Sequence, residues 1–483
     1  MELALTIDTA FPEPLHQQVY GQLRQAILSG RLQPGQRIPA SRALAKSLGL
    51  SRTTVTQGYD QLIDEGYLQT RPSAGTYVCE LPERLLEANS VEQNHQVVRD
   101  ISLSAYGQQV HQSLPRPVRE LCEISFRYGQ PALDLFPVEL WRKLLSKHCR
   151  AAADWLGYAE DAYGYLPLRQ AIADYLQRSR AVQCSSNQVL VTNGSQQALS
   201  LITQLLVNPD DSIAMEDPGY RGASQIFKTS GANVLSIPVD RDGLAVEQLI
   251  HHGKTPRLVY VTPSHQFPTG ALLSLSRRLA LLQWAYQNNV LIVEDDYDSE
   301  YRYGGRPIPS LQGLDTYSSV LYVGTFSKVM FPSIRLGYLV LPESLVEVFG
   351  KAKWLADRQP PKLTQYALTE FITVGHLDRH LRKMRLCYER RRRVLVQALY
   401  EHFGAAVEIL GDSAGLHIMA KLPLALSDGD AIAKAASVGV EICSAQVQYE
   451  VPGNTGEYVF GYTNITEEQI KQGIALIAKA FQG

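Results

Sequence analysis

The first predictable element of the chain is a short helix near the amino terminus. Apolar residues recur at helical spacing at Leu15, Val19, Leu23 and Ile27, and Gly30 follows them as a C-terminal stop. This spacing places the four side chains on one face of a helix, with polar residues between them. The pattern therefore predicts a helix that buries a single stripe.

Two more helices are predicted after the turn at Pro34–Gly35. Ser41 is expected to cap a helix that runs to Leu48, and Gly49 is expected to make the tight turn that follows it. Ser51 is expected to cap a third helix. The inward face of this third helix carries Val55, Tyr59, Leu62 and Ile63.

A hairpin and a polar stretch follow the third helix. Residues 67–78, YLQTRPSAGTYV, alternate around a Pro-Ser-Ala-Gly turn, which is typical of a two-stranded wing. Residues 10–80 are therefore predicted to form a winged helix-turn-helix domain. Residues 81–120 lose periodicity and are predicted to be a linker that spans up to ~35 Å as a flexible coil. Alternatively, the string LPERLLEAN within it forms a short docked helix.

Strands and helices alternate from residue 121 to residue 483, which predicts an α/β domain. The apolar strings QVLVT, SIAME, LVYVTP, VLIVED and VLYVG are the predicted strands. With 483 residues, 45% of them apolar, the chain has enough material for two or three cores.

Composition narrows the cellular setting. The six cysteines show no paired spacing, which favours free thiols over a disulfide frame or a zinc site, so no metal is expected. The chain starts without a secretion signal and has no apolar run of ~18 residues, so we expect a cytoplasmic protein that does not bind membranes.

Charge is distributed unevenly along the chain. The formal net charge is -2, yet residues 14–59 contain six Lys or Arg residues and no Asp or Glu. Arg52, Thr53 and Gln57 are predicted to point outward near the start of the third helix, where helix-turn-helix proteins contact DNA bases and phosphates. Arg71 and Ser73 are predicted near the tip of the wing. A merely solvated face is the alternative interpretation.

The string PASRALAKSLGLSRTTVTQGYDQLIDEGY resembles the winged-helix domain of the GntR family of bacterial regulators. Members share the pattern P-S-x-R-x-L-A-x-x-L-G-x-S-R-x-T-V, from which this chain departs only by Ala40 before Ser41. The resemblance implies binding to double-stranded promoter DNA. By matched position, the implied DNA contacts are Arg42, Arg52, Thr54 and Gly75.

Residues able to do chemistry stand at the carboxyl ends of the five predicted strands, the edge at which open α/β sheets bind ligands. Lys328, in the string VLYVGTFSKVMFPSIRLGYLV, is followed seven residues later by Arg335. A Lys and an Arg in this arrangement suit an aldehyde cofactor that carries a phosphate, which is pyridoxal 5'-phosphate (PLP). The strand ends carry Gly194, Ser195 and Gln196; Asp217 and Tyr220; Ser264 and His265; Asp295 and Tyr297; and Ser327 and Lys328.

Each of these residues has a physical role if PLP is the ligand. Lys328 would form the Schiff base, and Asp295 would keep the pyridine nitrogen protonated. The amides of residues 194–196 at a helix start, with Ser327 and Arg335, would bind the phosphate. Tyr220 is expected to stack on the ring, and Tyr297 to donate to its phenolic oxygen. His265 is expected either to contact the cofactor or to satisfy backbone groups.

The region from residue 123 to residue 483 resembles fold-type I aminotransferases. The strings DAYGYLPLRQAIADYL, TPSHQFPTG and EDDYDSEYRY resemble the MocR subfamily of GntR regulators still more closely. The resemblance implies a large domain with a mixed sheet and a small subdomain at about 345–483, in a PLP-binding head-to-tail homodimer. Phe267 departs from the Asn that the enzymes usually carry before Pro-Thr-Gly.

The carboxylate-binding arginine of aminotransferases is missing from its expected place. No Arg follows Arg393, and the segment ICSAQVQYEVPGNTGEYVFGYTN has neither Arg nor Lys. Either the small-molecule effector is PLP or an amine without the usual carboxylate, or a large-domain residue such as Arg221 or Arg358 binds the carboxylate. We favour the first hypothesis.

Three functions remain open from the sequence. We favour a PLP-dependent transcriptional regulator with at most partial transaminase chemistry. A bifunctional or vestigial aminotransferase that turns over an amine donor and a keto acceptor is the alternative, and a dimerisation unit without cofactor is the third. The basic string HLRKMRLCYERRRRVL is interpreted as a solvated helix face rather than a second DNA contact.

Overall fold

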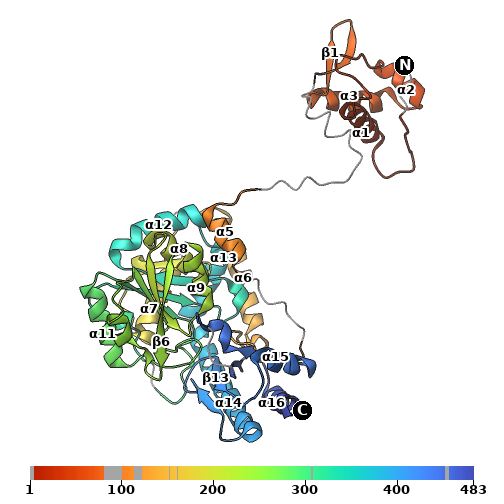
Figure 1. Cartoon of the computed structure of the whole chain (residues 1–483). Coiled ribbons are helices and arrows are strands. Elements are labelled where there is room, and N and C mark those ends of the chain that lie inside the picture. The colour runs from red at the N-terminus through yellow and green to blue at the C-terminus, as the bar shows by residue number, and fades with distance from the viewer. Residues whose placement is uncertain are drawn as a thin grey trace. The chain divides into compact units, whose positions relative to one another are not determined.

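The computed structural model describes residues 5–80, 101–113, 122–151, 153–159, 161–305, 308–451 and 456–482. The chain divides into two compact units, Met1–Ser102 and Leu103–Gly483, which are considered one at a time (Figure 1). Among the described residues, no helix has the length and apolar character needed to span a membrane.

The first unit is a three-helix module with a hairpin. The helices α1 and α2 both pack on α3, around core residues that include Val19, Leu23 and Leu62. The predicted cap at Ser51 is present, since its Oγ accepts the Thr54 amide at 3.1 Å. The elements are α1 (Leu15–Leu28), α2 (Ser41–Leu48), α3 (Arg52–Asp64), β1 (Leu68–Arg71) and β2 (Gly75–Val78).

One predicted cap in this unit is wrong. Ser41 is the first residue of α2, and the residue before it, Ala40, occupies the capping position without a side-chain hydrogen bond. The extended backbone at Ala40 delays the helix by one residue, which moves the Ser41 hydroxyl past the position from which it can cap. The predicted turn at Gly49 is confirmed by its left-handed φ of 66°.

A helix absent from the sequence interpretation lies within the predicted linker. Helix α5 (Ala105–Gln112) begins after Ser104, whose Oγ accepts the Gly107 amide at 3.1 Å. None of its residues is buried, which explains why no clear apolar period marked it. The string LPERLLEAN and residues 114–120 lie outside the described residues.

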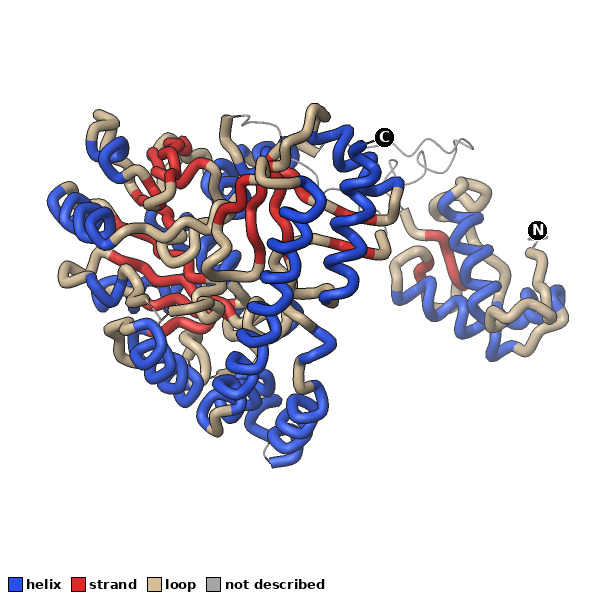
Figure 2. The backbone as a smooth tube through the Cα atoms, turned by 90° about the horizontal axis from the view of Figure 1, so that it is seen from below, coloured by secondary structure: helices blue, strands red, loops and turns tan. Residues whose placement is uncertain are grey.

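The second unit is built on an eight-stranded mixed sheet of order β4-β11-β10-β9-β8-β5-β6-β7, with helices on both sides (Figures 1 and 2). All five predicted strands are present and point the same way, because β5, β8, β9 and β10 are parallel and β4 is joined to β10 through the antiparallel β11. The strands are β4 (Val189–Thr192), β5 (Ser212–Asp217), β6 (Asn233–Asp240), β7 (Gly243–Leu244), β8 (Leu258–Val261), β9 (Leu291–Asp296), β10 (Val320–Thr325) and β11 (Gly337–Val340).

Alternate residues of each central strand enter different cores. On β9, Val293 packs in the core beneath α8 and α9, whereas Ile292 packs in the core beneath α11. The strand is therefore buried on both faces, which is why it reads as a continuous apolar run. The helices around the sheet are α6 (Val138–Ala151), α7 (Leu166–Arg180), α8 (Ser195–Leu206), α9 (Arg221–Thr229), α10 (Val246–Ile250), α11 (Leu275–Gln287), α12 (Glu343–Asp357) and α13 (Lys362–Thr373).

The carboxy-terminal part of this unit forms a smaller layered subdomain. Its four-stranded sheet has the order β12-β13-β16-β15, and a separate parallel pair joins β14 to β3, which comes from the start of the unit. The long helix α14 packs on α16. These elements are β3 (Ile124–Ser125), α14 (His376–Phe403), β12 (Glu408–Leu410), β13 (His417–Lys421), α15 (Asp428–Ser437), β14 (Val440–Glu441), β15 (Cys443–Ser444), β16 (Glu457–Gly461) and α16 (Glu467–Gln482).

Candidate cofactor site and DNA-binding surface

A cavity of about 210 Å³ opens where the carboxyl ends of the central strands meet. Because parallel strands end at one edge of the sheet, side chains far apart in sequence converge there. Of the predicted cofactor residues, Gly194 and His265 do not line the cavity. Those that do are Ser195, Gln196, Tyr220, Asp295, Tyr297, Ser327, Lys328 and Arg335.

Lys328 follows β10 and extends into this cavity. Its Nζ donates to the carbonyl oxygen of Gly129 at 2.7 Å. Burial lowers the pKa of Lys328, while Asp298 and Asp295 act in the opposite direction. A lowered pKa increases the neutral amine fraction, which is the nucleophilic form. Gly129 has a φ of +82°, a backbone conformation that favours glycine, and a Cβ there would lie 2.9 Å from Nζ.

Asp295, on β9, has one satisfied and one unsatisfied carboxylate oxygen. Its Oδ2 accepts the Tyr260 hydroxyl at 2.6 Å. Its Oδ1 is buried without a hydrogen-bond partner in the described part of the chain. Burial raises the pKa of Asp295 to about 6, and the Tyr260 hydrogen bond opposes this shift. A buried acceptor without a partner is costly, and the protonated nitrogen of a pyridine ring would satisfy it. The residues present therefore fit PLP.

The next residue on β9 faces the other side of the sheet. Asp296 Oδ2 accepts from Arg180 Nε at 2.8 Å and from the Tyr322 hydroxyl at 2.6 Å. Successive side chains of a strand point to opposite faces of the sheet, so these two adjacent carboxylates lie in different surroundings. Two protein donors hold Oδ2 of Asp296, whereas Oδ1 of Asp295, a residue that lines the cavity, has no partner among the described residues.

One end of the cavity is formed by the first turn of α8, with Ser195 and Gln196 in its wall. Helix starts bind anions because their amides lack partners. The guanidinium of Arg335 donates to the Asn193 carbonyl at 2.7 Å. Gly194 contributes indirectly: its φ is +88°, and a Cβ there would meet Arg335 at 3.2 Å.

This end of the cavity is supported from α12. Asp357 accepts from the side-chain amides of Asn193 at 2.6 Å and Gln197 at 2.7 Å. Its other oxygen pairs with Lys353 at 2.5 Å, and Lys353 is fully buried. The ion pair between Lys353 and Asp357 therefore holds Asn193 and Gln197, and with them the start of α8, in position.

His265 lies behind Tyr297 rather than in the cavity wall. Its Nδ1 lies 3.0 Å from the Tyr297 hydroxyl and 3.1 Å from Asp298 Oδ2. Together with His417, these side chains bring possible metal-ligand atoms within 4.8 Å of one another. We interpret the group as a hydrogen-bond cluster that orients Tyr297, because His417 Nε2 already faces the Pro268 carbonyl oxygen at 3.1 Å.

The predicted DNA-contacting side chains of the first unit lie mostly on its surface. Arg42, Arg52, Thr53, Gln57, Arg71 and Ser73 are exposed, whereas Thr54 and Gly75 are half-buried. Among the described residues, no ion pair involves Arg42, Arg52 or Arg71, so their charges are available to a polyanion. Arg71 stacks over Tyr77 at 4.7 Å, and Gly75 approaches Arg37 so closely that a Cβ would lie 2.8 Å from its Nε.

Comparison with known proteins agrees with both halves of this arrangement. Residues 15–78 match the family of bacterial regulatory proteins of the gntR type, and residues 124–438 match aminotransferase class I and II. The chain is 38% identical to the probable rhizopine catabolism regulatory protein MocR of Rhizobium meliloti, over 99% of this chain and 96% of the relative. The chain belongs to the MocR subfamily of GntR-type regulators.

Other relatives of this MocR-type regulator span both units. The transcriptional regulator TauR of Rhodobacter capsulatus is 34% identical over 99% of this chain and all of its own length. Among solved structures, the α-aminoadipate aminotransferase LysN of Thermus thermophilus, complexed with a phosphopyridoxyl-leucine, is 28% identical with a TM-score of 0.72. The match covers 78% of this chain and 97% of LysN.

Several cavity residues of the MocR-type chain were missed by the sequence interpretation. Tyr260 and Thr262 lie on a predicted strand end, so their alternation with Val261 was a usable signal. Thr325 directly follows the predicted strand VLYVG and carried the same strand-end signal. Tyr128 and Gly129, which precede α6, gave no such signal, nor did Leu416 and His417, which belong to the small subdomain. The missed lining residues are Tyr128, Gly129, Tyr260, Thr262, Thr325, Pro332, Leu416 and His417.

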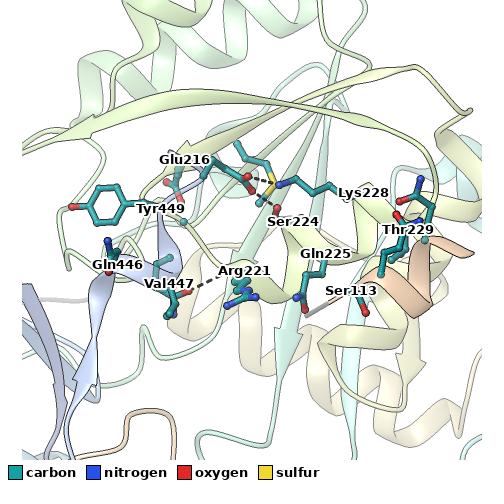
Figure 3. A pocket seen from close by; sticks show the side chains of 16 residues that line it. Ser113, Glu216, Arg221, Ser224, Gln225, Lys228, Thr229, Gln446, Val447 and Tyr449 are labelled. Carbon is teal, nitrogen blue, oxygen red and sulfur yellow. Dashed lines mark hydrogen bonds and ion pairs between the residues drawn. The ribbon is translucent and has the colours of Figure 1, made fainter. Parts of the chain in front are cut away.

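Neither large-domain arginine that was considered for carboxylate binding lines the cofactor cavity. Arg221 lies in a separate pocket of about 570 Å³ beside Val447 and Gln225 (Figure 3). Arg358 packs over the Trp354 ring at 3.9 Å. Phe267, the departure from the enzymes, is buried and lines the cavity with its ring 5.1 Å from that of Tyr128.

The basic run on α14 makes contacts within the protein. Arg390 pairs with Glu467 at 3.4 Å, and Arg393 pairs with Glu389 at 3.7 Å. The two arginines between them contact the carbonyl oxygens of Thr463 and Asp412. These contacts support the interpretation of the run as a helix face that packs and is solvated.

Proposed function

We propose that this MocR-type protein is a PLP-dependent, DNA-binding transcriptional regulator. The observation that carries the proposal is the cofactor cavity. Lys328 and Asp295 both line this cavity together with the start of α8, and Oδ1 of Asp295 has no partner among the described residues. When bound, PLP supplies an electrophilic aldehyde carbon conjugated to an electron-withdrawing ring.

Different residues of the chain bind different parts of PLP. Lys328 provides the amine for covalent attachment, and the Asp295 carboxylate accepts a hydrogen bond from the protonated ring nitrogen. Ser195, Gln196 and Ser327 donate to the phosphate, and Arg335 adds a positive charge. Tyr220 packs against the ring with its hydroxyl held by Gln196 Nε2 at 2.8 Å. Tyr297 donates toward the phenolic oxygen, oriented by His265.

The effector is PLP itself or an amine without a carboxylate in the usual place. In the described lining of the cavity, the cationic side chains are Lys328 and Arg335, and both have roles with the cofactor. Burial lowers the pKa of His417 to about 3, so this ring stays neutral at physiological pH. A carboxylate in the cavity would therefore lose its hydration without gaining a cationic partner.

The first unit supplies the DNA-binding activity. Arg52, Thr53 and Gln57 at the start of α3 suit contact with base edges in the major groove, with Arg42 and Thr54 on phosphates and Arg71, Ser73 and Gly75 in the wing. We further propose a cytoplasmic, head-to-tail homodimer. Exposed apolar side chains such as Tyr158 (85%) and Leu355 (79%) support a covered surface in the assembly.

Two measurements test the proposal. Borohydride reduction of the protein incubated with PLP, followed by peptide mapping, is expected to label Lys328 and to leave the Lys328→Ala variant unlabelled. DNA affinity is then measured at one fixed salt concentration as PLP is titrated. A large change identifies PLP as the signal, and no change moves the search to amines. Absence of label, or multiple turnover with an amine and a keto acid, would contradict the regulator as proposed.

A further inference from the structure

A second pocket, distinct from the cofactor cavity, lies where three elements meet. These are the end of α7, the segment after β9 (residues 299–305) and the first half of α14. Its volume is about 300 Å³, at the lower end of small-molecule sites. Arg180, Arg302, Arg382 and Arg385 all line it. Four arginines from three segments in one small pocket repel one another unless their charges are compensated.

Among the described residues, only one of these four charges has a direct ion-pair partner. Arg180 pairs with Asp296 at 2.8 Å. In the part of the chain that the structure describes, the other three form no ion pair. Arg385 donates twice to the carbonyl oxygen of Glu300, at 2.8 and 3.1 Å, and Arg382 Nε donates to the Asp378 carbonyl at 3.2 Å. Neutral carbonyl oxygens position these guanidinium groups without neutralising them.

In one of the three arginines, a buried side-chain nitrogen has no hydrogen-bond partner among the described residues. Arg302 Nε is buried and has no partner among the described residues. Leaving a charged donor unsatisfied in this way costs more than leaving a neutral one. An unsatisfied buried donor beside a cavity indicates a missing partner, and the partner of a guanidinium is an anion.

The carboxyl groups of the pocket do not balance the arginines. Asp378 and Arg382 are both exposed to solvent, so the charges of these two residues are screened alike, and the balance is decided by the less exposed Arg302 and Arg385. Glu300 is half-buried, accepts the Tyr175 hydroxyl at 2.9 Å, and has a pKa that desolvation raises to about 7. It is therefore partly protonated near neutral pH, which leaves an excess of positive charge in the pocket.

We propose that the pocket between α7, the segment after β9 and α14 binds a phosphate-type oxyanion through Arg302, Arg382 and Arg385. A guanidinium matches such an anion with two parallel hydrogen bonds, so three of them can enclose it. The site lies apart from the phosphate end of the cofactor cavity. It does not depend on whether PLP binds at Lys328.

Calorimetric titration at constant ionic strength tests the proposal on the full-length protein. The probes are inorganic phosphate and a small monoester, glycerol phosphate, and the tighter of the two identifies the source of the anion. Saturable binding is expected in the wild type and in Arg335→Gln, which weakens only the cofactor's phosphate site. Arg302→Gln and Arg382→Gln are expected to weaken this binding by about tenfold or more.

The matched control is Arg393→Gln, which removes a guanidinium from the same helix outside the pocket. Its phosphate affinity should equal that of the wild type. The proposal is overturned if phosphate binding is lost in Arg335→Gln alone, if Arg302→Gln and Arg382→Gln bind like the wild type, or if no variant binds phosphate at all. Because Arg382 is exposed, its variant keeps the test valid even if Arg302→Gln fails to fold.

Discussion

Replacing Tyr260 by Phe isolates the hydrogen bond that keeps Asp295 ionised. Tyr260 is fully buried, and its hydroxyl donates to Asp295 Oδ2 at 2.6 Å. Phe keeps the ring and its packing against Phe227, and it removes only the donor. The expected result is a higher pKa for Asp295, because the charged form loses a partner while the burial that disfavours it stays.

The size of the shift follows from the strength of the contact. A hydrogen bond to a charged group contributes about 1.5–3 kcal/mol, which corresponds to about 1–2 pKa units. In the native chain, burial raises the pKa of Asp295 to about 6. The variant should therefore titrate at about 7–8, and its ionised fraction at pH 7 should fall by about two- to tenfold.

The assay is the affinity of the apoprotein for PLP as a function of pH, followed by absorbance. The protonated ring nitrogen binds the ionised carboxylate, so affinity is lost as pH falls through the pKa of Asp295. In Tyr260→Phe this loss should begin about 1–2 pH units higher than in the wild type. Dividing the variant curve by the wild-type curve removes the titrations of Lys328 and of PLP itself.

Tyr322→Phe is the matched control. Tyr322 is equally buried and donates over the same 2.6 Å to the neighbouring Asp296, which does not line the cavity. Its pH profile should coincide with that of the wild type. The reasoning is refuted if Tyr260→Phe leaves the profile in place, or if Tyr322→Phe moves it as far.

Three further predictions concern other parts of the chain. Arg52→Gln should weaken DNA binding by about tenfold and reduce the salt slope by about 1, whereas Arg24→Gln, which removes a charge stacked on Tyr67, should change neither in a binding titration at several salt concentrations. Leu62 is fully buried, so Leu62→Ala should destabilise the first unit by about 2–5 kcal/mol, as measured by calorimetry. An equal shift in the unfolding transition of the second unit would contradict the inference that the two units have separate cores. Burial raises the pKa of Glu216 to about 7 from 4.5, so the folded state binds more protons than the unfolded state between these values and the stability contributed by this group falls as pH rises. The free energy of unfolding, measured with urea, should therefore fall between pH 5 and pH 8 by up to about 3 kcal/mol less in Glu216→Gln than in the wild type. An equal fall in the two proteins would refute this prediction.

Much of the architecture was predictable because its causes are local. Helical spacing at Leu15, Val19, Leu23 and Ile27 produced α1, and the hydroxyl of Ser51 caps α3 as expected. The same locality explains the errors: the cap assigned to Ser41 was one residue out, and α5 carries no buried stripe by which it could be recognised.

The strand-end rule brought Asp295 and Lys328 to one edge from sequence alone, because parallel strands must end together. What surrounds them was decided only by tertiary structure. The Lys328 amine meets a carbonyl 199 positions earlier in the chain, and His417 reaches the cavity from another subdomain. Similarly, only the packing of α14 against the segment after β9 brings Arg302 beside Arg382 and Arg385. Periodicity and capping depend on neighbours within a few residues, whereas these contacts depend on how whole elements pack, and no local pattern records that.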